Sequence, residues 1–345
     1  MKNQKKIKLS ICIATMNRAY YLNQLINKII LQYQNNIELV IVDGASSDNT
    51  SEIISNAKEK IPNMQYIRLE AKGGVDNDFS LAVQKAKGEF CWLLPDDDLI
   101  KPDAIKKILM MINNNINLII LNAEIWSKDM KFLLACQAIK IDEDRHYNSL
   151  NFNDFFISFS NHMSFIGSVV IRKSIWNKRK KQKYFGSWFV HVGVIFQDFL
   201  DGIKVIAEPM IKIRYGNASW STKSFEITLF KWPELIWSFN LFDDKVKQKI
   251  VKKFPWKSIA RISLFKARGA FTFKEYNLFI KNKLTLNKKL LFWVILIIPG
   301  FFLNFLFIIY FNVFRWKHKH WKLQIYDLKN SNNYYKKYLN KLKLN

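Results

Sequence analysis

The chain has 345 residues, of which 49% are hydrophobic and 15% aromatic, so it is not a disordered chain and is long enough for one or two domains. Its net charge of +26 is uneven: residues 221–345 carry 25 basic and 6 acidic side chains, whereas residues 1–90 and 91–220 carry only +3 and +4. This basic end favours an anionic membrane surface or a nucleic acid as partner, with a general Lys, Asn and Ile bias as the alternative.

The N-terminus is basic, but the apolar run at residues 9–14 is too short for the apolar region of a signal peptide. Three cysteines, Cys12, Cys91 and Cys136, stand in apolar surroundings without the spacing of metal ligands. This pattern predicts a reducing compartment and no disulfide framework. We therefore expect the catalytic part of the chain to lie in the cytosol.

The first half of the chain alternates short β-branched runs with longer helical patterns. The predicted strands are residues 8–14, 37–43, 64–70, 89–95 and 117–123. The predicted helices cover about 20–32, 49–60 and 78–87, and a fourth opens at Pro102, since proline is favoured in a first helical turn. Nearly continuous apolar strands between helices predict an α/β domain with a mostly parallel, Rossmann-like sheet over residues 1–220.

The second half is expected to be helical and basic over residues 221–289, apolar over 290–314, and basic again over 315–345. The apolar segment is long enough to span a bilayer, but Pro299-Gly300 interrupts its middle and both flanks are basic. The positive-inside rule places both flanks on the cytoplasmic side. We therefore favour a helix pair that dips into one leaflet over a true span or a buried soluble helix pair.

Several tail residues fit this membrane interpretation. Trp293, Trp316 and Trp321 suit anchoring at a membrane interface. His318 and His320 stand in the basic tail and are expected to be membrane-facing charge rather than metal ligands. Membrane lipid is the favoured partner and nucleic acid is not, because phosphate binding would not need the apolar segment.

Polar and acidic residues follow the predicted strands, at residues 15–18, 43–48, 73–76 and 96–98. Open parallel sheets bind ligands at the carboxyl ends of their strands, so these groups should meet at one crevice. Carboxylates gathered there would repel each other unless the crevice holds a divalent cation. The pattern predicts a Mg²⁺ or Mn²⁺ site that faces a diphosphate.

The motifs "SICIATMNR", "LVIVDGASSDNT" and "GGVDNDFSLAVQKAKGEFCWLLPDDDLIKPDAI" follow one another at the predicted strand ends. In this order and spacing the chain resembles family 2 glycosyltransferases of the GT-A fold over about residues 8–215. The segments "GGVDNDF" and "CWLLPDDD" look like those of abequosyltransferase-like enzymes of bacterial O-antigen (lipopolysaccharide) and capsule synthesis. A family 2 enzyme inverts configuration by one direct displacement from a nucleotide-sugar.

The resemblance implies roles for the residues behind the first strands. Asp43 would hydrogen-bond the base or ribose of the nucleotide-sugar, with a turn-forming role before Gly44 as the alternative. Thr15, Asn17 and Arg18 would line the same pocket, with Arg18 close to phosphate. Asp76 would face the nucleoside. For Asp48 we favour a helix N-cap over a role in binding.

The aspartate triplet would bind the donor and the metal. The family's DXD-type pattern is Asp-x-Asp-Asp, and Pro95 stands where its first aspartate often lies. It is therefore open which carboxylate binds ribose and which binds the metal. Asp98 is the first choice for Mn²⁺ or Mg²⁺, together with Asp96, which would point the same way on an extended loop. Asp96 and Asp97 are also expected at the nucleotide-sugar, and a solvated acidic turn is the alternative.

The acceptor hydroxyl needs a base, which the family usually places in an acidic element downstream. This chain has "GSWFVHVGVIFQDFLDG" there, with His191 near the expected position. A structural histidine or a third metal ligand is the alternative, and Asp198 is the second candidate base. The segment Ile213–Ser221, with Arg214, Asn217 and Trp220, would either fold over the substrates or serve as an exit loop.

The sequence thus predicts an inverting, metal-dependent glycosyltransferase on the cytoplasmic face of the plasma membrane. Its donor would be a nucleoside-diphosphate sugar, with a CDP- or dTDP-linked deoxysugar as a candidate, and its acceptor a polyprenyl-diphosphate-linked glycan. Two rival classes are a sugar nucleotidyltransferase and a non-catalytic membrane assembly protein. The first lacks support because no Gly-rich phosphate loop follows the first strand, and the second because all three aspartates are present.

Overall fold

The computed structural model of this chain describes residues 6–217, 221–314 and 321–337. The chain divides into two compact units, each described below by itself. The first unit contains the described residues up to 217 together with Trp237–Ile250, and the second contains residues 221–236 and the described residues from Val251 onward. Segment 237–250, which the sequence placed in the basic helical region, thus packs with the first unit.

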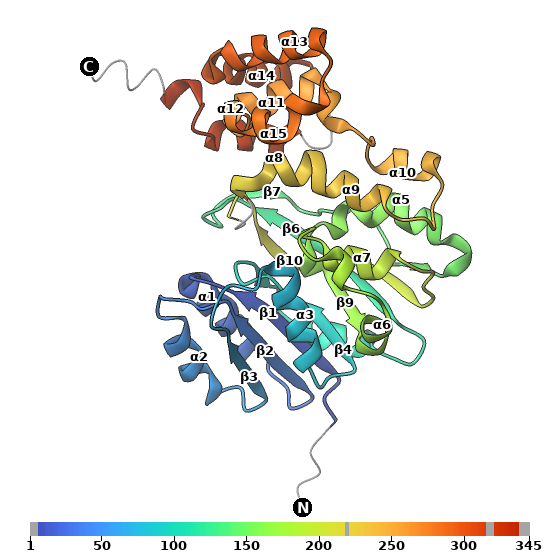
Figure 1. The fold of residues 1–345 in the computed structure, drawn as a ribbon. Helices are drawn as coiled ribbons and strands as arrows, with labels where there is room; N and C mark the ends of the chain where they lie inside the picture. The colour runs from blue at the N-terminus through green and yellow to red at the C-terminus, as the bar shows by residue number, and fades with distance from the viewer. Residues whose placement is uncertain (1–5, 218–220, 315–320, 338–345) are drawn as a thin grey trace, which may run out of the picture. The chain divides into compact units, whose positions relative to one another are not determined.

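The first unit is built on a sheet in which β1 to β4 are parallel neighbours (Figure 1). Its strands are β1 (Leu9–Thr15), β2 (Ile37–Asp43), β3 (Met64–Arg68), β4 (Phe90–Leu93), β5 (Leu99–Ile100), β6 (Leu118–Trp126), β7 (Leu133–Ala135), β8 (Arg145–Tyr147), β9 (Val169–Arg172) and β10 (Ile203–Arg214). The order along the sheet is β3-β2-β1-β4-β9-β6-β10-β5, with β7 paired to β6 and β8 to β10. All five strands predicted from the sequence are present.

The sheet is mixed beyond β4, and this differs from a simple parallel arrangement. Strand β9 lies between β4 and β6 and runs antiparallel to both. Strand β6, predicted as the fifth strand of the alternation, therefore does not pair with β4. The later strand β10 returns parallel to β6 and ends level with it, Arg214 opposite Trp126. Arg214 thereby reaches the loop after β4.

Helices cover both faces of this sheet. Those of the first unit are α1 (Ala19–Ile30), α2 (Thr50–Lys58), α3 (Val75–Lys85), α4 (Ala104–Met111), α5 (Phe152–Met163), α6 (Lys173–Lys178), α7 (Val190–Phe196) and α10 (Asp244–Ile250). One core joins alternate residues of β1 and β2, such as Ile11 and Leu39, with apolar side chains of α1, α2 and α4. Helix α3 contacts β1 and β2 and belongs to the opposite face, as a right-handed return from β3 to β4 requires.

Aromatic packing fixes the segment 237–250 in the first unit. The Phe156 ring of α5 stacks on Phe242 with centroids 3.8 Å apart and an angle of 9° between the planes. Phe239 contacts Phe156 and Phe196 edge-on. Burying each such ring stabilises the folded chain by about 1.5–3 kcal/mol.

The second unit is helical. Its helices are α8 (Ser224–Glu226), α9 (Trp232–Trp237, which ends at the boundary of the unit), α11 (Ile259–Ala267), α12 (Phe273–Glu275), α13 (Leu286–Ile297), α14 (Gly300–Phe314) and α15 (Trp321–Asn330). Its core includes Phe225 and Phe271, whose rings stack 5.2 Å apart, together with Phe292 of α13. The break predicted at Pro299-Gly300 is present, because α13 ends at Ile297 and α14 begins at Gly300.

Among the described residues, no single helix is both long and apolar enough to cross a membrane. Helices α13 and α14 meet that test only as a pair, bent by 91° at their break. The flanking residues Trp316, His318 and His320 lie outside the part of the chain that the structure describes.

Candidate active site

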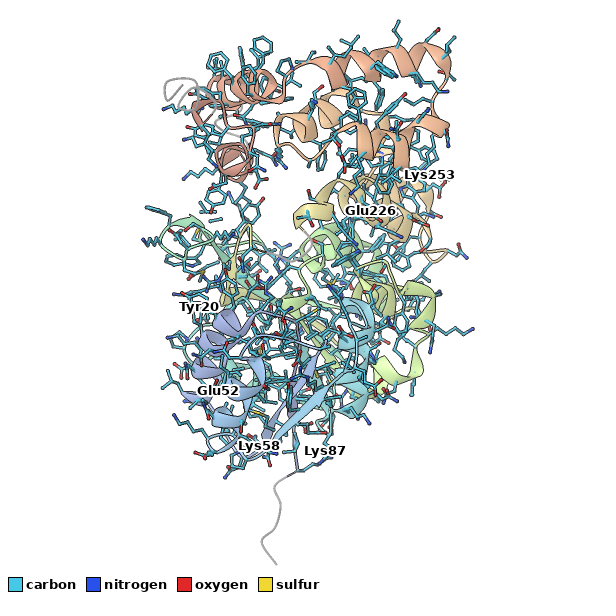
Figure 2. The ribbon with its side chains drawn as sticks, turned by 60° about the vertical axis from the view of Figure 1, so that its left-hand side comes forward. Tyr20, Glu52, Lys58, Lys87, Glu226 and Lys253 are labelled. Carbon is cyan, nitrogen blue, oxygen red and sulfur yellow. The ribbon has the colours of Figure 1, made fainter. Side chains whose placement is uncertain are left out.

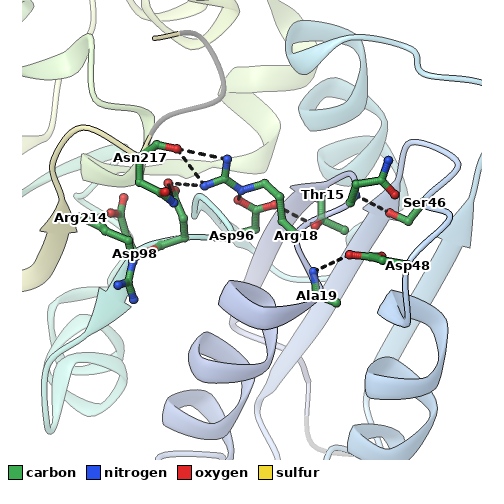
Figure 3. Close-up of polar contacts among 11 residues, drawn as sticks. Thr15, Arg18, Ala19, Ser46, Asp48, Asp96, Asp98, Arg214 and Asn217 are labelled. Carbon is green, nitrogen blue, oxygen red and sulfur yellow. Dashed lines mark hydrogen bonds and ion pairs between the residues drawn. The ribbon is translucent and has the colours of Figure 1, made fainter. Parts of the chain in front are cut away.

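The candidate site lies where the order of the parallel strands reverses, between β1 and β4. Thr15 ends β1, and its Oγ1 donates to Oδ2 of Asp96, 2.8 Å away, in the loop after β4 (Figure 3). In open α/β sheets the crevice at such a reversal is the place where ligands bind. The structure therefore brings Thr15 and Asp96 together, as the sequence predicted.

Arg18, between β1 and α1, supplies the positive charge that the aspartate triplet requires. Its Nε lies 3.0 Å from Asp96 Oδ1, and its Nη2 donates to Asp97 Oδ2 at 2.5 Å. All three side chains are at least 84% buried. Arg18 also donates to the backbone oxygen of Asn217. The guanidinium thus opposes the charge of two neighbouring carboxylates.

A second arginine at the end of β10 completes the cluster. The backbone N–H of Arg214 donates to Asp98 Oδ1 at 2.7 Å, and its Nε donates to the backbone oxygen of Asp97 at 2.9 Å. Asn217, three residues on, donates from Nδ2 to Asp97 Oδ2. The segment after β10 is therefore bound to the aspartate loop, so for its described residues the simple exit-loop alternative is not supported.

Burial determines the protonation of this loop. It raises the pKa of Asp96 to about 7, although the neighbouring Arg18 charge acts in the opposite direction. It raises the pKa of Asp98 well above the usual range, and the Asp97 carboxylate adds to that shift. Three adjacent aspartates are therefore tolerated because two guanidinium groups oppose their charge and part of that charge is removed by protonation.

The expectation that Asp96 and Asp98 point the same way is wrong. It assumed an extended loop, but Asp96 and Asp97 lie in a turn. Asp96 and Asp97 share Arg18, whereas Asp98 is directed to the backbone of Arg214. A turn interrupts the two-residue alternation of an extended chain, and so neighbours in the triplet share a partner.

Asn17 and Asp48 connect the loops after β1 and β2. The Asn17 backbone N–H donates to Ser46 Oγ, and its Oδ1 accepts from the Ser47 backbone. Asp48 accepts from the first backbone N–H of α1, at Ala19, and from both the backbone and side chain of Thr50 in α2. Asp48 therefore serves the N-termini of two helices, where a carboxylate is favourable.

Asp43 supports the turn after β2, and its contact with a nucleoside stays a prediction. It is fully buried, its Oδ1 accepts from the Ser46 backbone, and its Oδ2 accepts from the Tyr66 hydroxyl at 2.7 Å. Burial, followed by this hydrogen bond, raises the pKa of Tyr66 to about 12, so the hydroxyl keeps its proton. Both carboxylate oxygens are thus in use, which supports the turn-forming alternative.

Asp76 likewise binds protein rather than an open site. Its two oxygens accept the backbone N–H groups of Trp188 and Val190, each at 2.9 Å. Burial raises the pKa of Asp76, while these amides act in the opposite direction. Asp76 therefore connects the start of α3 to the start of α7, beside the crevice, and positions the loop between residues 187 and 190.

His191 does not join the aspartate cluster. It lies in α7, is fully buried, and its Nε2 is 2.7 Å from the backbone oxygen of Met163. A carbonyl only accepts, so Nε2 carries the proton and Nδ1, which has no partner among the described residues, is the unprotonated atom. Burial lowers the pKa of His191 to about 4. The enclosed position supports the structural alternative over a base in contact with an acceptor.

Asp198, the second candidate base, lies just after α7. Its Oδ1 accepts from the next backbone N–H, that of Phe199, and its carbonyl accepts from Arg179. It is not part of the hydrogen-bonded cluster around the aspartate triplet. The structure thus places neither candidate base beside the carboxylates.

The sequence analysis did not predict that the Tyr21 ring contacts both arginines of the cluster. The guanidinium carbons of Arg18 and Arg214 lie 5.1 and 5.0 Å from the ring centroid of Tyr21. Gln24, one helical turn further along α1, accepts from Arg214. The spacing from 18 to 21 and 24 puts these residues on one face of a helix, a signal that was available in the sequence.

The oxygen donors here are of the type that Mg²⁺ and Mn²⁺ prefer. Both oxygens of Asp96 are engaged, but Asp97 Oδ1 and Asp98 Oδ2 receive no hydrogen bond from a described residue. Within the described part of the chain, no group of three His, Cys, Asp or Glu side chains is arranged to hold a metal. Magnesium sites that use one or two carboxylates with substrate phosphates need no such group, so the residues fit a cation that arrives with a diphosphate.

Comparison with known proteins identifies relatives of this chain. Residues 10–171 match the family described as Glycosyl transferase family 2. The abequosyltransferase RfbV of Salmonella typhimurium is 26% identical over 239 residues, which cover 62% of this chain and 69% of that protein. A Campylobacter jejuni protein named GalNAc(5)-diNAcBac-PP-undecaprenol beta-1,3-glucosyltransferase is 28% identical over 107 residues, 31% of this chain and 35% of its own.

The fold has solved counterparts as well. The crystal structure of S. aureus TarS 1–349 with UDP-GlcNAc matches with a TM-score of 0.55 and 15% identity, over 82% of this chain and 78% of that one. At that identity the likeness shows the fold alone. It confirms the predicted GT-A-like α/β architecture, a central sheet flanked by helices, and the family match confirms the resemblance drawn from the motifs. This chain is therefore a glycosyltransferase that carries a family 2 domain.

Proposed function

We propose that this glycosyltransferase takes its sugar from a nucleoside-diphosphate donor, bound with Mn²⁺ or Mg²⁺, and transfers it with inversion to a polyprenyl-diphosphate-linked glycan. The reaction would serve surface polysaccharide synthesis, such as O-antigen or capsule, at the cytoplasmic face of the plasma membrane. The observation that carries the proposal is the convergence of Thr15, Arg18 and residues 96–98 at the reversal of strand order. The likeness to an abequosyltransferase supports a CDP- or dTDP-linked deoxysugar as the donor.

The donor diphosphate would bind where Arg18 now pairs with two carboxylates. A diphosphate offers several oxygens to a guanidinium, which binds phosphate with two parallel hydrogen bonds. Arg18 would turn toward the diphosphate, and the aspartates would then be free for the cation. Asp98, whose Oδ2 is open, is the proposed first metal ligand, and Asp96, which Thr15 orients, is the proposed second. When bound, the cation would stabilise the charge that develops on the leaving diphosphate.

Arg214 and Asn217 would hold the segment after β10 over this region. Arg214 contacts the aspartate loop through its backbone N–H and through Nε, and it reaches Gln24 of α1. These contacts exclude water from the carboxylates, each of which belongs to a residue at most 8% exposed. A drier site strengthens the electrostatic contacts to a diphosphate.

The membrane part of the proposal is based on the surface of the second unit. Helices α13 and α14 expose large apolar side chains, at 39–81% of their full area: Leu286, Leu290, Leu291, Trp293, Val294, Ile297, Phe302, Phe305, Leu306, Ile309, Tyr310, Val313 and Phe314. Exposed apolar surfaces of this extent mark interaction sites. Residues 221–345 carry 25 basic and 6 acidic side chains, which suits a bilayer with anionic headgroups.

Packing of α14 favours a position within one leaflet. Its exposed residues 302, 305, 306, 309 and 313 repeat every three or four positions and so lie on one face. The opposite face carries Asn304, fully buried, whose Nδ2 donates to the carbonyls of Ala267 in α11 and Leu328 in α15. A helix held on one side by other helices presents only its other side to lipid.

The donor half is tested by isothermal titration of the detergent-purified full chain with CDP, UDP, GDP and dTDP, with and without Mn²⁺. We expect one nucleotide to bind in a metal-dependent way and Asp98→Asn to weaken that binding at least about 10-fold. Glu52→Gln, an exposed position on α2 (Figure 2), is the matched control and should bind as the unchanged chain does. If none of the four nucleotides binds with or without metal, the proposed donor is wrong.

The membrane half is tested by flotation with vesicles. We expect the chain to float with vesicles that contain anionic phospholipid and to float less with purely zwitterionic ones. The triple variant Leu290→Glu, Ile297→Glu, Val313→Glu should stay at the bottom of the gradient. Leu150→Glu is the control, because Leu150 of the first unit is 94% exposed but lies outside α13 and α14. Equal flotation of the triple variant would refute the assignment of this surface.

A further inference from the structure

A row of aromatic rings crosses the second unit, outside the apolar surface of α13 and α14. The Phe254 ring lies 6.1 Å from that of Trp256, measured between centroids. Trp256 stacks with Phe230 at 6.3 Å and an angle of 11°, and Phe230 stacks with Phe279 at 5.3 Å. These rings come from three segments far apart in the sequence, so the fold brings them together.

Lysine ammonium groups lie against this row. Lys257 Nζ is 4.4 Å from the Phe254 centroid, and Lys253 Nζ is 6.0 Å from the same centroid. Lys283 Nζ is 4.6 Å from the Phe230 centroid. An ammonium within about 6 Å of an aromatic face is attracted to it. The rings therefore position the three lysines in advance, so that less conformational entropy is lost when they bind a partner.

This part of the chain has few carboxylates to pair with the lysines. Residues 251–289 contain 11 basic side chains and one acidic side chain, Glu275. That carboxylate already accepts from the backbone N–H and the hydroxyl of Thr272. Among the described residues, neither Lys257 nor Lys283 forms an ion pair with a carboxylate. Gathered like charges repel one another, and an anionic partner would relieve that repulsion.

The exposed apolar residues around the lysines favour a membrane lipid as this partner. Phe254 is 48% exposed and Leu278 is 65% exposed. Leu286, which is 81% exposed, begins α13 just after Lys283, so the cluster continues along the chain into the apolar surface of α13. Aliphatic side chains bury well against acyl chains. A nucleic acid bound at the same lysines would gain from aromatic rings but little from leucines.

We propose that Lys253, Lys257 and Lys283 bind the phosphate of an anionic membrane lipid headgroup, and that Phe254 inserts at the boundary between headgroups and acyl chains. The inference rests on the membrane part of the proposed function and deepens it. Helices α13 and α14 would supply insertion into the leaflet, whereas this cluster would supply the preference for anionic lipid. A lysine near an anionic bilayer contributes about 5-fold to binding.

The test measures partitioning of the full chain onto vesicles of phosphatidylcholine alone and of phosphatidylcholine mixed with phosphatidylglycerol. The triple variant Lys253→Gln, Lys257→Gln, Lys283→Gln should lose about 100-fold in partitioning onto the anionic vesicles. It should keep its partitioning onto the zwitterionic vesicles within about 2-fold, which also shows that it is folded. Phe254→Ala should lose about 3- to 10-fold on both vesicle types, because about half of its ring is available for insertion.

The matched control removes the same charge from the first unit. The triple variant Lys58→Gln, Lys87→Gln, Lys106→Gln changes three exposed lysines, two of which Figure 2 labels. It should partition onto both vesicle types as the unchanged chain does. An equal loss in this control would show that net charge alone sets the preference and would overturn the inference.

Two outcomes separate this inference from the proposed function. Equal partitioning of the Lys253, Lys257 and Lys283 variant and the unchanged chain onto anionic vesicles would overturn the inference and leave the membrane role of α13 and α14 in place. Failure of the unchanged chain to bind either vesicle would overturn the membrane part of the proposed function and this inference with it. An oligo(dT) single strand is the second probe. If the variant loses affinity for oligo(dT) and not for anionic vesicles, the partner is nucleic acid and the inference is wrong.

Discussion

Arg18 provides the strongest quantitative test of the aspartate cluster. It pairs with Asp96 and Asp97, and the three side chains are 16%, 9% and 10% exposed. Removing one partner of a buried ion pair leaves an uncompensated charge and costs about 3–5 kcal/mol. Arg18→Ala should therefore lower the free energy of unfolding by about 3 kcal/mol at pH 8, the lower end of that range, because residual exposure screens the pair.

The stability that Arg18→Ala loses should depend on pH, in a direction set by the pKa of Asp96. Without the guanidinium, the pKa of Asp96 rises further above its present value of about 7, whereas an unfolded aspartate ionises near about 3.9. A folded carboxyl with a raised pKa is destabilising only when ionised. That cost is absent below the unfolded pKa and complete above the folded one. The difference between Arg18→Ala and the unchanged chain should thus be larger at pH 8 than at pH 5, by up to about 1.4 kcal/mol from Asp96.

Urea denaturation followed by circular dichroism, at pH 5 and pH 8, measures both quantities. Arg145→Ala, an exposed arginine of β8, is the matched control and should change stability by less than about 0.5 kcal/mol. Mn²⁺ should stabilise Arg18→Ala more than the unchanged chain, because the carboxylates no longer have a competing cation. A stability loss below about 0.5 kcal/mol at pH 8, or a larger loss at pH 5, would refute the reasoning.

Four further changes test other parts of the structure. Because the pKa of His191 is about 4 when folded and about 6.5 when unfolded, stability should fall as pH decreases from 6.5 to 4, and His191→Asn should remove about 3 kcal/mol of that dependence in urea titrations. Gly193→Ala places a Cβ 2.3 Å from the Tyr184 ring and should cost about 1–3 kcal/mol, read as a lower melting temperature. Asp76→Asn keeps one acceptor for two amides and should cost about 1–3 kcal/mol and speed proteolysis between residues 186 and 190. Asn304→Leu removes the three hydrogen bonds that Nδ2 donates to Ala267, Leu328 and Ser331 and should destabilise the second unit by about 3 kcal/mol, with nucleotide binding of the first unit unchanged.

The parallel half of the sheet was predictable because each strand is apolar over its whole length and is followed by a helical pattern. Strand β2 has the predicted bounds, and β1, β3 and β4 differ by one or two residues at their ends. Strand β9 was not predicted. Its four residues, Val169–Arg172, are too few to show a period, and its antiparallel position between β4 and β6 is set by contacts distant in the chain.

The site was predictable in its position but not in its pairings. Strand ends identify which residues meet at the crevice, and so Thr15, Arg18 and the aspartates were found together. Which carboxylate remains open depends on local turns and on segments far along the chain. The protein contacts of Asp43 and Asp76 were not predicted, because an aspartate behind a strand can serve a turn or a substrate equally well. A sequence pattern around Asp76 cannot predict its hydrogen bond with the Trp188 backbone N–H, which lies more than one hundred residues away in the chain.

Three of the five described residues other than glycine that have a positive φ border the crevice; the other two, Asp103 and Met130, lie elsewhere. Asn17, Ala45 and Trp188 have φ of 53°, 66° and 74°, a region that costs about 1–3 kcal/mol for residues other than glycine. Asn17 follows β1, Ala45 follows β2, and the Trp188 amide is held by Asp76, so all three border the crevice. Hydrogen bonds hold each of these conformations. Asn17 accepts from the Ser47 backbone, Ala45 lies in the turn closed by Asp43, and the Trp188 backbone N–H donates to the buried Asp76 carboxylate. Strain that is held in place around one crevice, together with buried and ion-paired aspartates, is what a preorganised binding site requires and a purely structural edge does not.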